Sequence, residues 1–476
     1  MMSKSRSSCK ITLLCEPSTK TKPFATTSRL NSVFSGLLLA LALLAPVALI
    51  GHSATAQVWL TPGNQISPLR TGADLNQARL SLIQEARQFI YIKTFIINRD
   101  DTENAVYGAL CERARGGLDV RILVDDLGRR QGGNPMRSSG EPYSIEGLRS
   151  CGIRVETFAP PLWGPLAFLL YNQHDKMLVT EQAAILGGTN FSRDYSRHGQ
   201  LSPYWYDFDI RVRGPAVCSL QRIFSQSWRQ VERKTLELLS RSVRQTLTPL
   251  IQSRFSSSTL VETCSATPVP QGDSLMILYG NPYVSSERPF LAFLETGMRA
   301  LRRESASEDR VIRLYAPYFV PSDEFTAQLM GAARNGIRVQ IITNSETSID
   351  PEAAPAYAAM LMRTADLIRA GVEIYLWNPA GTSRALDRNN VFHRKGGCLG
   401  RRQCFVGSHN LDVRGDEYSS ELLAVFSDRT LIDHQIEDFQ ADLGHSTRIM
   451  EEDRRRLLRA TRARDRVAAR AFGWAM

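Results

Sequence analysis

The chain repeats itself at a constant offset, and this internal duplication limits its possible folds more than any other feature. Two early segments match two later segments at one and the same offset without gaps: Gly117–Leu123 with Gly336–Ile342, and Gly152–Val155 with Gly371–Ile374. Because 476 residues exceed one ordinary hydrophobic core, the repeat predicts two lobes of the same fold joined in one chain.

The same offset relates two copies of the triplet His-x-Lys, one with His174 and Lys176 and the other with His393 and Lys395. Beyond residue 56 the chain has six His and four Lys in 420 positions, so chance predicts roughly 0.06 such triplets. The chain has 50 Arg and only 8 Lys, yet both triplets keep Lys, whose compact ammonium differs from a planar guanidinium. The phased pair therefore indicates a repeated catalytic half-site.

Short runs rich in β-branched residues alternate with helix-like segments in both halves, a pattern typical of βαβ units. The expected strands are Phe89–Ile97, Val120–Asp125, Ile153–Phe158, Val311–Tyr315, Val339–Thr343 and Val372–Trp377. The expected helices are Asn104–Arg115, Ser144–Arg149, Phe325–Arg334 and Ala358–Arg369. We therefore expect an α/β protein with two αβα lobes, mixed and mostly parallel sheets, and an active site at the lobe interface.

The segment 1–56 has the layout of a signal peptide. A basic stretch precedes the apolar run Leu37–Ile50 and the small residues 54–56, which predicts cleavage before Gln57. An uncleaved anchor over Val33–Gly51, or an overextended start, stays open because the basic stretch is unusually long. In each case we expect the catalytic body to be exported, either periplasmic or membrane-associated.

The remaining boundaries follow the repeat. We expect a first lobe over 57–235, a connecting helix and linker over 236–272, a second lobe over 273–445 and a basic C-terminal helix over 446–476. Of the formal net charge of +10, the segments 1–56 and 446–476 contribute +5 each, so the body is nearly neutral. That balance disfavours nucleic acid as a partner. The tail suits either an anionic lipid surface or plain solvation.

Six cysteines follow the predicted leader, and an even number in an exported protein indicates disulfides. Cys398 and Cys404 flank a predicted hairpin turn, so their pairing is favoured; Cys111 with Cys151 and Cys218 with Cys264 would complete a local set among the fifteen pairings possible. A zinc site is the alternative for one cluster, whose ligands would be His393, Cys398, Cys404 and His409. Export and the role of His393 in the repeat favour the disulfide.

Each triplet is expected to open a strand, so that its His and Lys share one face. Small-residue corners follow at residues 187–190 and 407–410. Two imidazoles and two ammonium groups brought together suit a phosphodiester. The expected helpers are amide donors (Asn190, Asn410), substrate-binding hydroxyls (Thr189, Ser408) and carboxylates that fix the imidazole tautomers (Asp207, Glu421). This scheme requires no metal and no cofactor.

These residues resemble the phospholipase D superfamily, whose repeated signature is His-x-Lys-x4-Asp followed by Gly-Gly or Gly-Ser and an Asn. The likeness covers nearly all of 57–445, and the segments 207–215, 317–321 and 343–345 are similar to the bacterial cardiolipin synthase branch. The resemblance implies a phosphohistidine intermediate, with His174 as nucleophile and His393 as general acid. The signature Asp is replaced by Glu181 and Gly400.

The sequence therefore predicts phosphatidyl transfer or hydrolysis on a glycerophospholipid, of cardiolipin synthase type, with the acceptor hydroxyl left open. A membrane surface is an expected partner, and no obligate protein partner is implied. The apolar stretch 160–170 suits either a rim that meets acyl chains or a packed core. A periplasmic nuclease and a noncatalytic lipid-binding protein are the alternatives. We expect His198, His434 and His445 to be surface or packing groups.

Overall fold

The computed structural model describes residues 57–98, 101–131, 144–158, 171–196, 204–237, 260–261, 264, 266–305, 309–378 and 390–473. The chain divides into Met1–His52 and Ser53–Met476, and all described residues belong to the second unit. The predicted leader, the apolar stretch 160–170, His198 and most of the connecting helix lie outside the described residues.

The first lobe begins with one long strand and then alternates strands and helices. Its elements are β1 (Gln57–Leu69), α2 (Gly72–Glu85), β2 (Phe89–Thr94), α3 (Asp101–Arg115), β3 (Asp119–Asp125), α4 (Asp126–Gln131), α5 (Ile145–Ser150), β4 (Arg154–Phe158), β5 (Asn172–Gln173), β6 (Met177–Thr180), β7 (Ala183–Gly187), α7 (Arg193–Ser196), β8 (Trp205–Tyr206), β9 (Asp209–Arg213) and α8 (Ala216–Glu237). All three predicted strands and both predicted helices of this half are present.

The second lobe repeats that order and adds a C-terminal extension. Its elements are β10 (Asp273–Gly280), α10 (Pro289–Leu301), β11 (Val311–Tyr315), α11 (Asp323–Arg334), β12 (Arg338–Asn344), η1 (Pro351–Ala353), α12 (Ala354–Arg363), α13 (Ala365–Arg369), β13 (Glu373–Trp377), β14 (Val391–Phe392), β15 (Gly396–Leu399), β16 (Gln403–Gly407), α14 (Val413–Glu417), β17 (Ser419–Phe426), α15 (Arg429–Gly444), β18 (Ser446–Ile449), α16 (Glu451–Ala460) and α17 (Ala463–Phe472). The single helix expected over Ala358–Arg369 is two helices that meet at Thr364.

Equivalent glycines end equivalent helices in the two lobes. Gly117 and Gly336 follow α3 and α11 with φ of 92° and 76°, and Gly152 and Gly371 follow α5 and α13 with φ of 96° and 94°. Only glycine adopts this left-handed conformation at little cost, so it stops the helix and turns the chain into the next strand. The matched glycines are the local basis of the repeated βαβ units.

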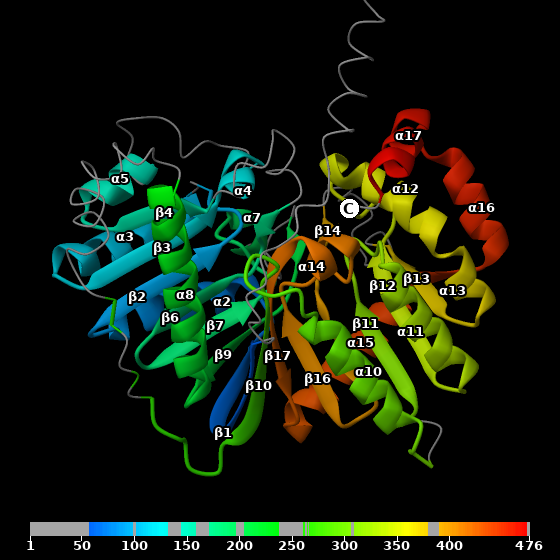
Figure 1. Ribbon diagram of the computed structural model, residues 1–476, viewed down its shortest axis with the longest axis horizontal. Coiled ribbons are helices and arrows are strands. Elements are labelled where there is room, and N and C mark those ends of the chain that lie inside the picture. The colour runs from blue at the N-terminus through cyan, green and yellow to red at the C-terminus, as the bar shows by residue number, and fades with distance from the viewer. Residues whose placement is uncertain are drawn as a thin grey trace, which may run out of the picture. The chain divides into compact units, whose positions relative to one another are not determined.

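One 16-stranded sheet runs through both lobes in the order β18-β13-β12-β11-β15-β16-β17-β10-β1-β9-β7-β6-β2-β3-β4, with β5 beside β17. Figure 1 shows β1 and β10 at the seam between the lobes. Pairing is parallel for β2-β3-β4 and β11-β12-β13 and antiparallel across the centre. The α/β class and the mixed sheet are confirmed, but the expected predominance of parallel pairing is wrong. The short β6-β7 and β15-β16 turns permit only antiparallel neighbours.

The hydrophobic core crosses the seam. One buried cluster combines Tyr91 and Phe224 of the first lobe with Leu275, Phe426 and Leu431 of the second. Separate clusters fill the outer part of each lobe. Because the lobes share a core and a sheet, their relative position is fixed by packing, and so is any site between them.

Three disulfides join Cys111 to Cys151, Cys218 to Cys264 and Cys398 to Cys404. The first ties α3 to the end of α5, and the last links the paired strands β15 and β16. Among the described helices, none is both long enough and apolar enough to cross a bilayer.

Candidate active site

Each His-x-Lys triplet lies between two strands, just before β6 or β15, rather than inside the strand it was expected to open. The two residues before each His pair with the opposite lobe: β5 runs parallel to the start of β17, and β14 runs parallel to β8. The ladders continue into the triplets, since His174 N–H donates to Ser420 O (3.1 Å) and His393 N–H donates to Tyr206 O (2.9 Å). Each histidine is therefore held by backbone bonds to the lobe it does not belong to.

This register sets each imidazole beside a carboxylate of the other lobe. His174 Nδ1 lies 2.9 Å from Glu421 Oε1, and His393 Nδ1 lies 2.6 Å from Asp207 Oδ2. A carboxylate at Nδ1 favours the tautomer with its proton there and leaves Nε2 free to meet a ligand. The sequence indicated both carboxylates but not that the pairs exchange lobes.

Equivalent residues at the ends of β3 and β12 hold the backbone directly before each histidine. Asp125 accepts the backbone N–H of Gln173 (2.8 Å), directly before His174. Asn344, its counterpart in the second copy of the repeat, donates to Phe392 O (2.8 Å), directly before His393, and to Pro317 O (2.9 Å). The motifs at 317–321 and 343–345 therefore meet at the backbone that carries the second histidine.

The two lysines lie buried in the same site. Lys176 donates to His174 O, and Lys395 Nζ lies 3.6 Å from Asp207 Oδ2. Burial lowers the pKa of Lys176 to about 7 and that of Lys395 to about 8, although nearby carboxylates oppose the effect. Lys395 further lowers the pKa of Lys176, as expected for two like charges close together.

Both imidazoles have lowered pKa values. Burial and the nearby Lys176 lower the pKa of His174 to about 4. Burial lowers the pKa of His393 well below its usual value, and Lys395, Lys176 and His174 add to the decrease. The pKa of Glu421 falls to about 2 because the nearby positive groups, His174 foremost, outweigh its burial. Groups from both lobes thus converge on one buried centre, where a bound anion would favour the charged forms of the two lysines.

The two predicted amides have different surroundings. Asn190 Oδ1 accepts the backbone N–H of Ile96 (3.0 Å), and its Nδ2 donates to Tyr195 OH (2.9 Å). Asn410 is 8% exposed, and its Oδ1 has no hydrogen-bond partner in the part of the chain that the structure describes. Asn190 is therefore a fixed part of the wall, whereas the buried Oδ1 of Asn410 is not held in this way by the described residues.

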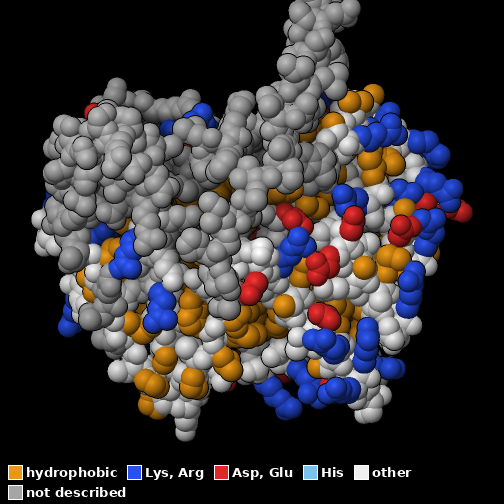
Figure 2. Space-filling view, in the orientation of Figure 1, with side chains coloured by type: hydrophobic (Ala, Val, Ile, Leu, Met, Phe, Trp, Pro, Cys, Tyr) orange, Lys and Arg blue, Asp and Glu red, His pale blue; other side chains and the backbone are white. Residues whose placement is uncertain are grey.

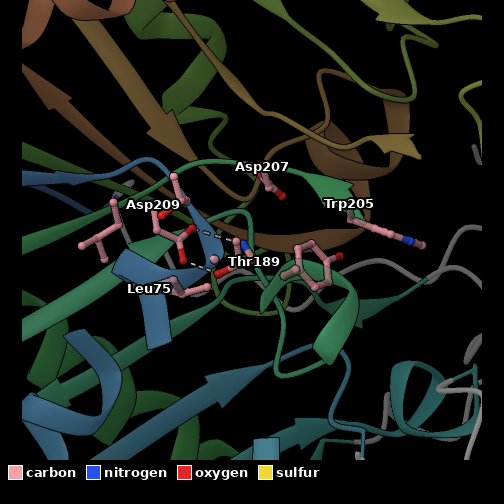
Figure 3. A pocket seen from close by; sticks show the side chains of 9 residues that line it. Leu75, Thr189, Trp205, Asp207 and Asp209 are labelled. Carbon is pink, nitrogen blue, oxygen red and sulfur yellow. Dashed lines mark hydrogen bonds between the residues drawn. The ribbon is translucent and has the colours of Figure 1, made fainter. Parts of the chain in front are cut away.

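Thr189 and Ser408, expected to bind substrate, are engaged inside the protein. Thr189 donates to Asp209 and accepts from Arg79 Nη2 (3.2 Å), and Figure 3 shows it beside the carboxylate of Asp209. Ser408 donates to Glu421 and accepts the N–H of Leu422 (3.0 Å). Both hydroxyls are thus bonded to internal carboxylates, and direct contact of Thr189 and Ser408 with a substrate stays a prediction.

The corner before Asn190 is tight for a physical reason. A Cβ at Gly188 would clash with the carboxylate of Asp207. The equivalent position in the second lobe is Ser408, whose hydroxyl holds Glu421 instead. Each corner is thus shaped around the carboxylate that orients an imidazole.

Aromatic residues that the sequence interpretation missed surround the imidazoles unequally. Trp205, Tyr195 and Tyr318 have ring centroids 4.8, 5.4 and 5.8 Å from His393, while Phe95 lies 5.1 Å from His174. The His174 side chain is 12% exposed and that of His393 4%. The sequence did contain one indication of an aromatic residue at the site, because Trp205 directly precedes Tyr206 and the predicted carboxylate Asp207.

The residues considered as zinc ligands do not form a metal site in this structure. Cys398 and Cys404 are bonded to each other, His409 Nδ1 accepts the N–H of Leu411 (2.9 Å), and its Nε2 lies 3.2 Å from Asp416. Within the described ranges no three His, Cys, Asp or Glu side chains are grouped as metal ligands.

The positions that replace the signature Asp stabilise turns. Glu181 accepts the backbone N–H groups of Arg87 (2.8 Å) and Gln88 (3.3 Å), and Gly400 has φ of 62° in the β15-β16 turn. Both substitutions therefore lie in supporting turns, away from the imidazoles.

Fold and site together define a duplicated α/β protein in which two His-x-Lys half-sites share one centre. A family model described as "Cardiolipin synthase, PLD-like domain" matches residues 80–202 and 304–443, more than half of the chain. The chain therefore belongs to this family, and it is an enzyme of the phospholipase D superfamily. The resemblance inferred from the two triplets is confirmed.

Known proteins show the same relationship. The cardiolipin synthase of Oceanobacillus iheyensis is 26% identical over 399 residues, which are 84% of this chain and 72% of that protein. Cardiolipin synthase A of Pseudomonas aeruginosa is 26% identical over 425 residues, 88% of this chain and 75% of that protein. The crystal structure of phosphatidylserine synthase from Haemophilus influenzae shares the fold, with a TM-score of 0.59 at 16% identity over 87% of this chain and 95% of that one.

Proposed function

We propose that this enzyme transfers a phosphatidyl group from one glycerophospholipid to a hydroxyl acceptor, in a reaction of cardiolipin synthase type, through a covalent phosphohistidine. The observation that carries the proposal is the exchanged pairing of both imidazoles with carboxylates beside two buried lysines. The names of the two relatives support a phospholipid substrate. The nearly neutral body gives nucleic acid no broad basic footprint.

In the first half-reaction, His174 Nε2 attacks phosphorus and the bond from phosphorus to the leaving glycerol oxygen breaks. His393 donates its proton to that oxygen, while Lys176 and Lys395 hold the nonbridging oxygens. In the second half-reaction, His393 takes a proton from the acceptor hydroxyl, whose oxygen attacks phosphorus and releases His174. We assign the nucleophile to His174 because it is the more exposed imidazole and its partner Glu421 is firmly ionised.

The general acid, His393, must carry a proton although burial lowers its pKa. The causes of that low pKa include the positive charge of Lys395 and Lys176. A bound phosphodiester brings a negative charge against both lysines and so offsets their effect on His393. We therefore infer that His393 gains its proton together with the substrate.

The proposed location is outside the cytoplasm. The three disulfides support it, because disulfides persist in oxidising compartments. The leader pattern of the segment 1–56 supports the same location.

The decisive experiment supplies phosphatidylglycerol, labelled in its terminal glycerol, to the enzyme in detergent with a chelator present. We expect one labelled glycerol to be released for each diphosphatidylglycerol formed. Phosphatidic acid as the main product would instead make the enzyme a hydrolase. Cleavage of plasmid DNA at low enzyme concentration, without lipid turnover, would support the nuclease alternative and contradict our proposal.

We expect kcat/KM for a short-chain phospholipid to depend on pH through two limbs. Activity rises through about pH 4 as His174 loses its proton. It then falls with pH because His393, whose pKa is lowered by burial, must take up a proton with the substrate, and it falls more steeply between about pH 7 and 8 as Lys176 and Lys395 lose theirs. The measurement is an initial-rate profile from pH 3.5 to 9.5 in detergent at constant ionic strength. In Lys395→Arg we expect a lower maximum, and a steepening above about pH 7 that comes from Lys176 and no longer from residue 395, since Arg stays charged. A flat profile above pH 6 would contradict this assignment of the lysines.

A further inference from the structure

Helices α16 and α17 form an extension of the second lobe that the family model, which ends at residue 443, does not include. Both pack against α12. Arg454 is buried in α16 and donates to Leu361 O (2.6 Å), and a Cβ at Gly473 would lie 3.6 Å from the side chain of Ala359. The pair is thus fixed on the lobe through α12.

The outward face of α17 combines apolar and basic side chains. Ala463, Val467 and Ala471 follow one another at four-residue spacing and are exposed, Val467 to 64%. Arg464 and Arg470 lie on either side of this line and are exposed as well. The helix therefore presents an apolar ridge with a guanidinium along each flank.

Positive charge is concentrated on the same two helices. From Glu451 to Phe472 the chain has eight arginines and four acidic residues, three of which open α16, and two of these pair with its first arginines. Arg459, Arg462 and Arg470 are exposed and make no ion pair within the described ranges. Figure 2 shows the Lys and Arg side chains gathered over α16 and α17, with hydrophobic side chains among them over α17.

Exposed hydrophobic residues are concentrated there too. Large hydrophobic side chains are exposed at six of the described positions, and three of these, Met450, Val467 and Phe472, belong to the extension. Phe472 is 52% exposed at the end of α17. Val467 lies on the ridge of α17, whereas Met450 directly precedes α16 and Phe472 is the last residue of α17.

The extension also lies near the wall of the active site. The helix on which it packs, α12, follows η1 and Asp350. Asp350 accepts from Tyr318 OH (2.6 Å), and the Tyr318 ring is 5.8 Å from His393. Figure 1 shows α17 and β14, which precedes His393, at the same end of the second lobe.

We propose that α17, with the exposed arginines of α16, docks on the surface of an anionic phospholipid bilayer and holds the active-site end of the second lobe against it. Charge alone would suit any polyanion, but the ridge of Ala463, Val467 and Ala471 adds apolar area that a lipid interface buries. The arginines at its flanks reach phosphate groups while their stems cover acyl chains. Docking on the bilayer does not itself depend on the proposed function. Only its benefit, the delivery of a lipid substrate to the active site, rests on that function.

The test is flotation of the full chain with vesicles of 30 mol% phosphatidylglycerol and 70 mol% phosphatidylcholine, in a His174→Asn background so that no lipid is consumed. The variant replaces Arg459, Arg462 and Arg470 by Gln. The matched control replaces Arg87, Arg302 and Arg303, which are exposed in turns outside α16 and α17, by Gln. All proteins carry the same N-terminal segment, so any contribution of that segment cancels.

We expect the tail variant to lose at least about tenfold in partition to these vesicles at low salt, and the control to lose much less. The difference should shrink at 0.5 M salt, where charges are screened. Val467→Ser should weaken binding at both salt concentrations, because it removes apolar area. Equal flotation of variant and control would overturn the proposal, as would a loss confined to binding of plasmid DNA.

Activity separates this proposal from the proposed function. With His174 restored, the tail variant should turn over short-chain phosphatidylglycerol in detergent at the normal rate and turn over vesicle lipid more slowly. If the unaltered enzyme does not turn over phosphatidylglycerol in detergent, the proposed function fails, while flotation still decides whether α17 binds lipid.

Discussion

His174→Asn is expected to lower kcat for phosphatidyl transfer by about 10⁴-fold or more and to abolish the covalent adduct. Asn fills a similar space but offers no nitrogen lone pair to phosphorus. The measurement is single-turnover kinetics with substrate labelled in its phosphorus, followed by denaturation and detection of label on the protein. The thermal midpoint should change little, because the side chain is partly exposed and only its pair with Glu421 is lost.

His393→Asn provides the matched control for that prediction. Its imidazole serves as acid, so a leaving group that needs no proton should bypass the loss. With a p-nitrophenyl phosphodiester, we expect the His393 variant to form the labelled adduct and hydrolyse it slowly, while the His174 variant forms none. The reverse pattern would exchange the two roles, and an adduct in both variants would contradict a histidine nucleophile.

Glu421 and Asp207 should act through the imidazoles. Glu421→Gln keeps the shape of the side chain but removes the charge that stabilises protonated His174, so we expect a smaller loss than in His174→Asn. The variant should also shift the acid limb of the pH profile downward, because Glu421 raises the pKa of His174 within its buried site. A purely structural role for Glu421 would change stability without moving that limb.

Local patterns were sufficient to predict most of the fold. The strands at 311–315 and 119–125 and the helix at 323–334 follow from β-branched runs and apolar spacing, and Gly117 and Gly336 mark the turns. The triplets, amides and carboxylates of the site were also readable, because an internal duplication shows which residues are kept together. Such signals are contained in short stretches of chain.

The relation between the lobes was not predictable in the same way. Pairing of β1 with β10 and of β5 with β17 joins strands from opposite halves of the chain, and no local pattern encodes that register. This register decides that each histidine pairs with a carboxylate of the other lobe, His174 with Glu421 and His393 with Asp207. The orientation of Thr189 and Ser408 likewise depends on strands that only the folded protein places beside them.

Lys93→Met is expected to lower the free energy of unfolding by about 3–5 kcal/mol, the largest stability effect we predict. Lys93 Nζ lies 2.6 Å from Asp175 Oδ2, both side chains are fully buried, and Ser420 of the second lobe donates to Asp175 Oδ1 (2.6 Å). Burial alone would lower the pKa of Lys93, but Asp175 and Tyr279 together raise it, so the ammonium stays charged. Removing it leaves a buried carboxylate without its counter-charge directly between His174 and Lys176.

The double variant Lys93→Met/Asp175→Asn should recover most of that loss, because no uncompensated charge remains and the amide still accepts from Ser420. Guanidinium unfolding of the disulfide-bonded protein measures both variants, with an unchanged m value as the condition for comparison. Arg299→Met, which breaks the exposed pair with Glu295, is the control and should cost less than about 1 kcal/mol. The double variant should also regain phosphatidyl transfer, since Asp175 faces away from the phosphate and acts by positioning the triplet. A single variant no less stable than the control, or a double variant as unstable as the single, would show that the ion pair does not hold this segment in place.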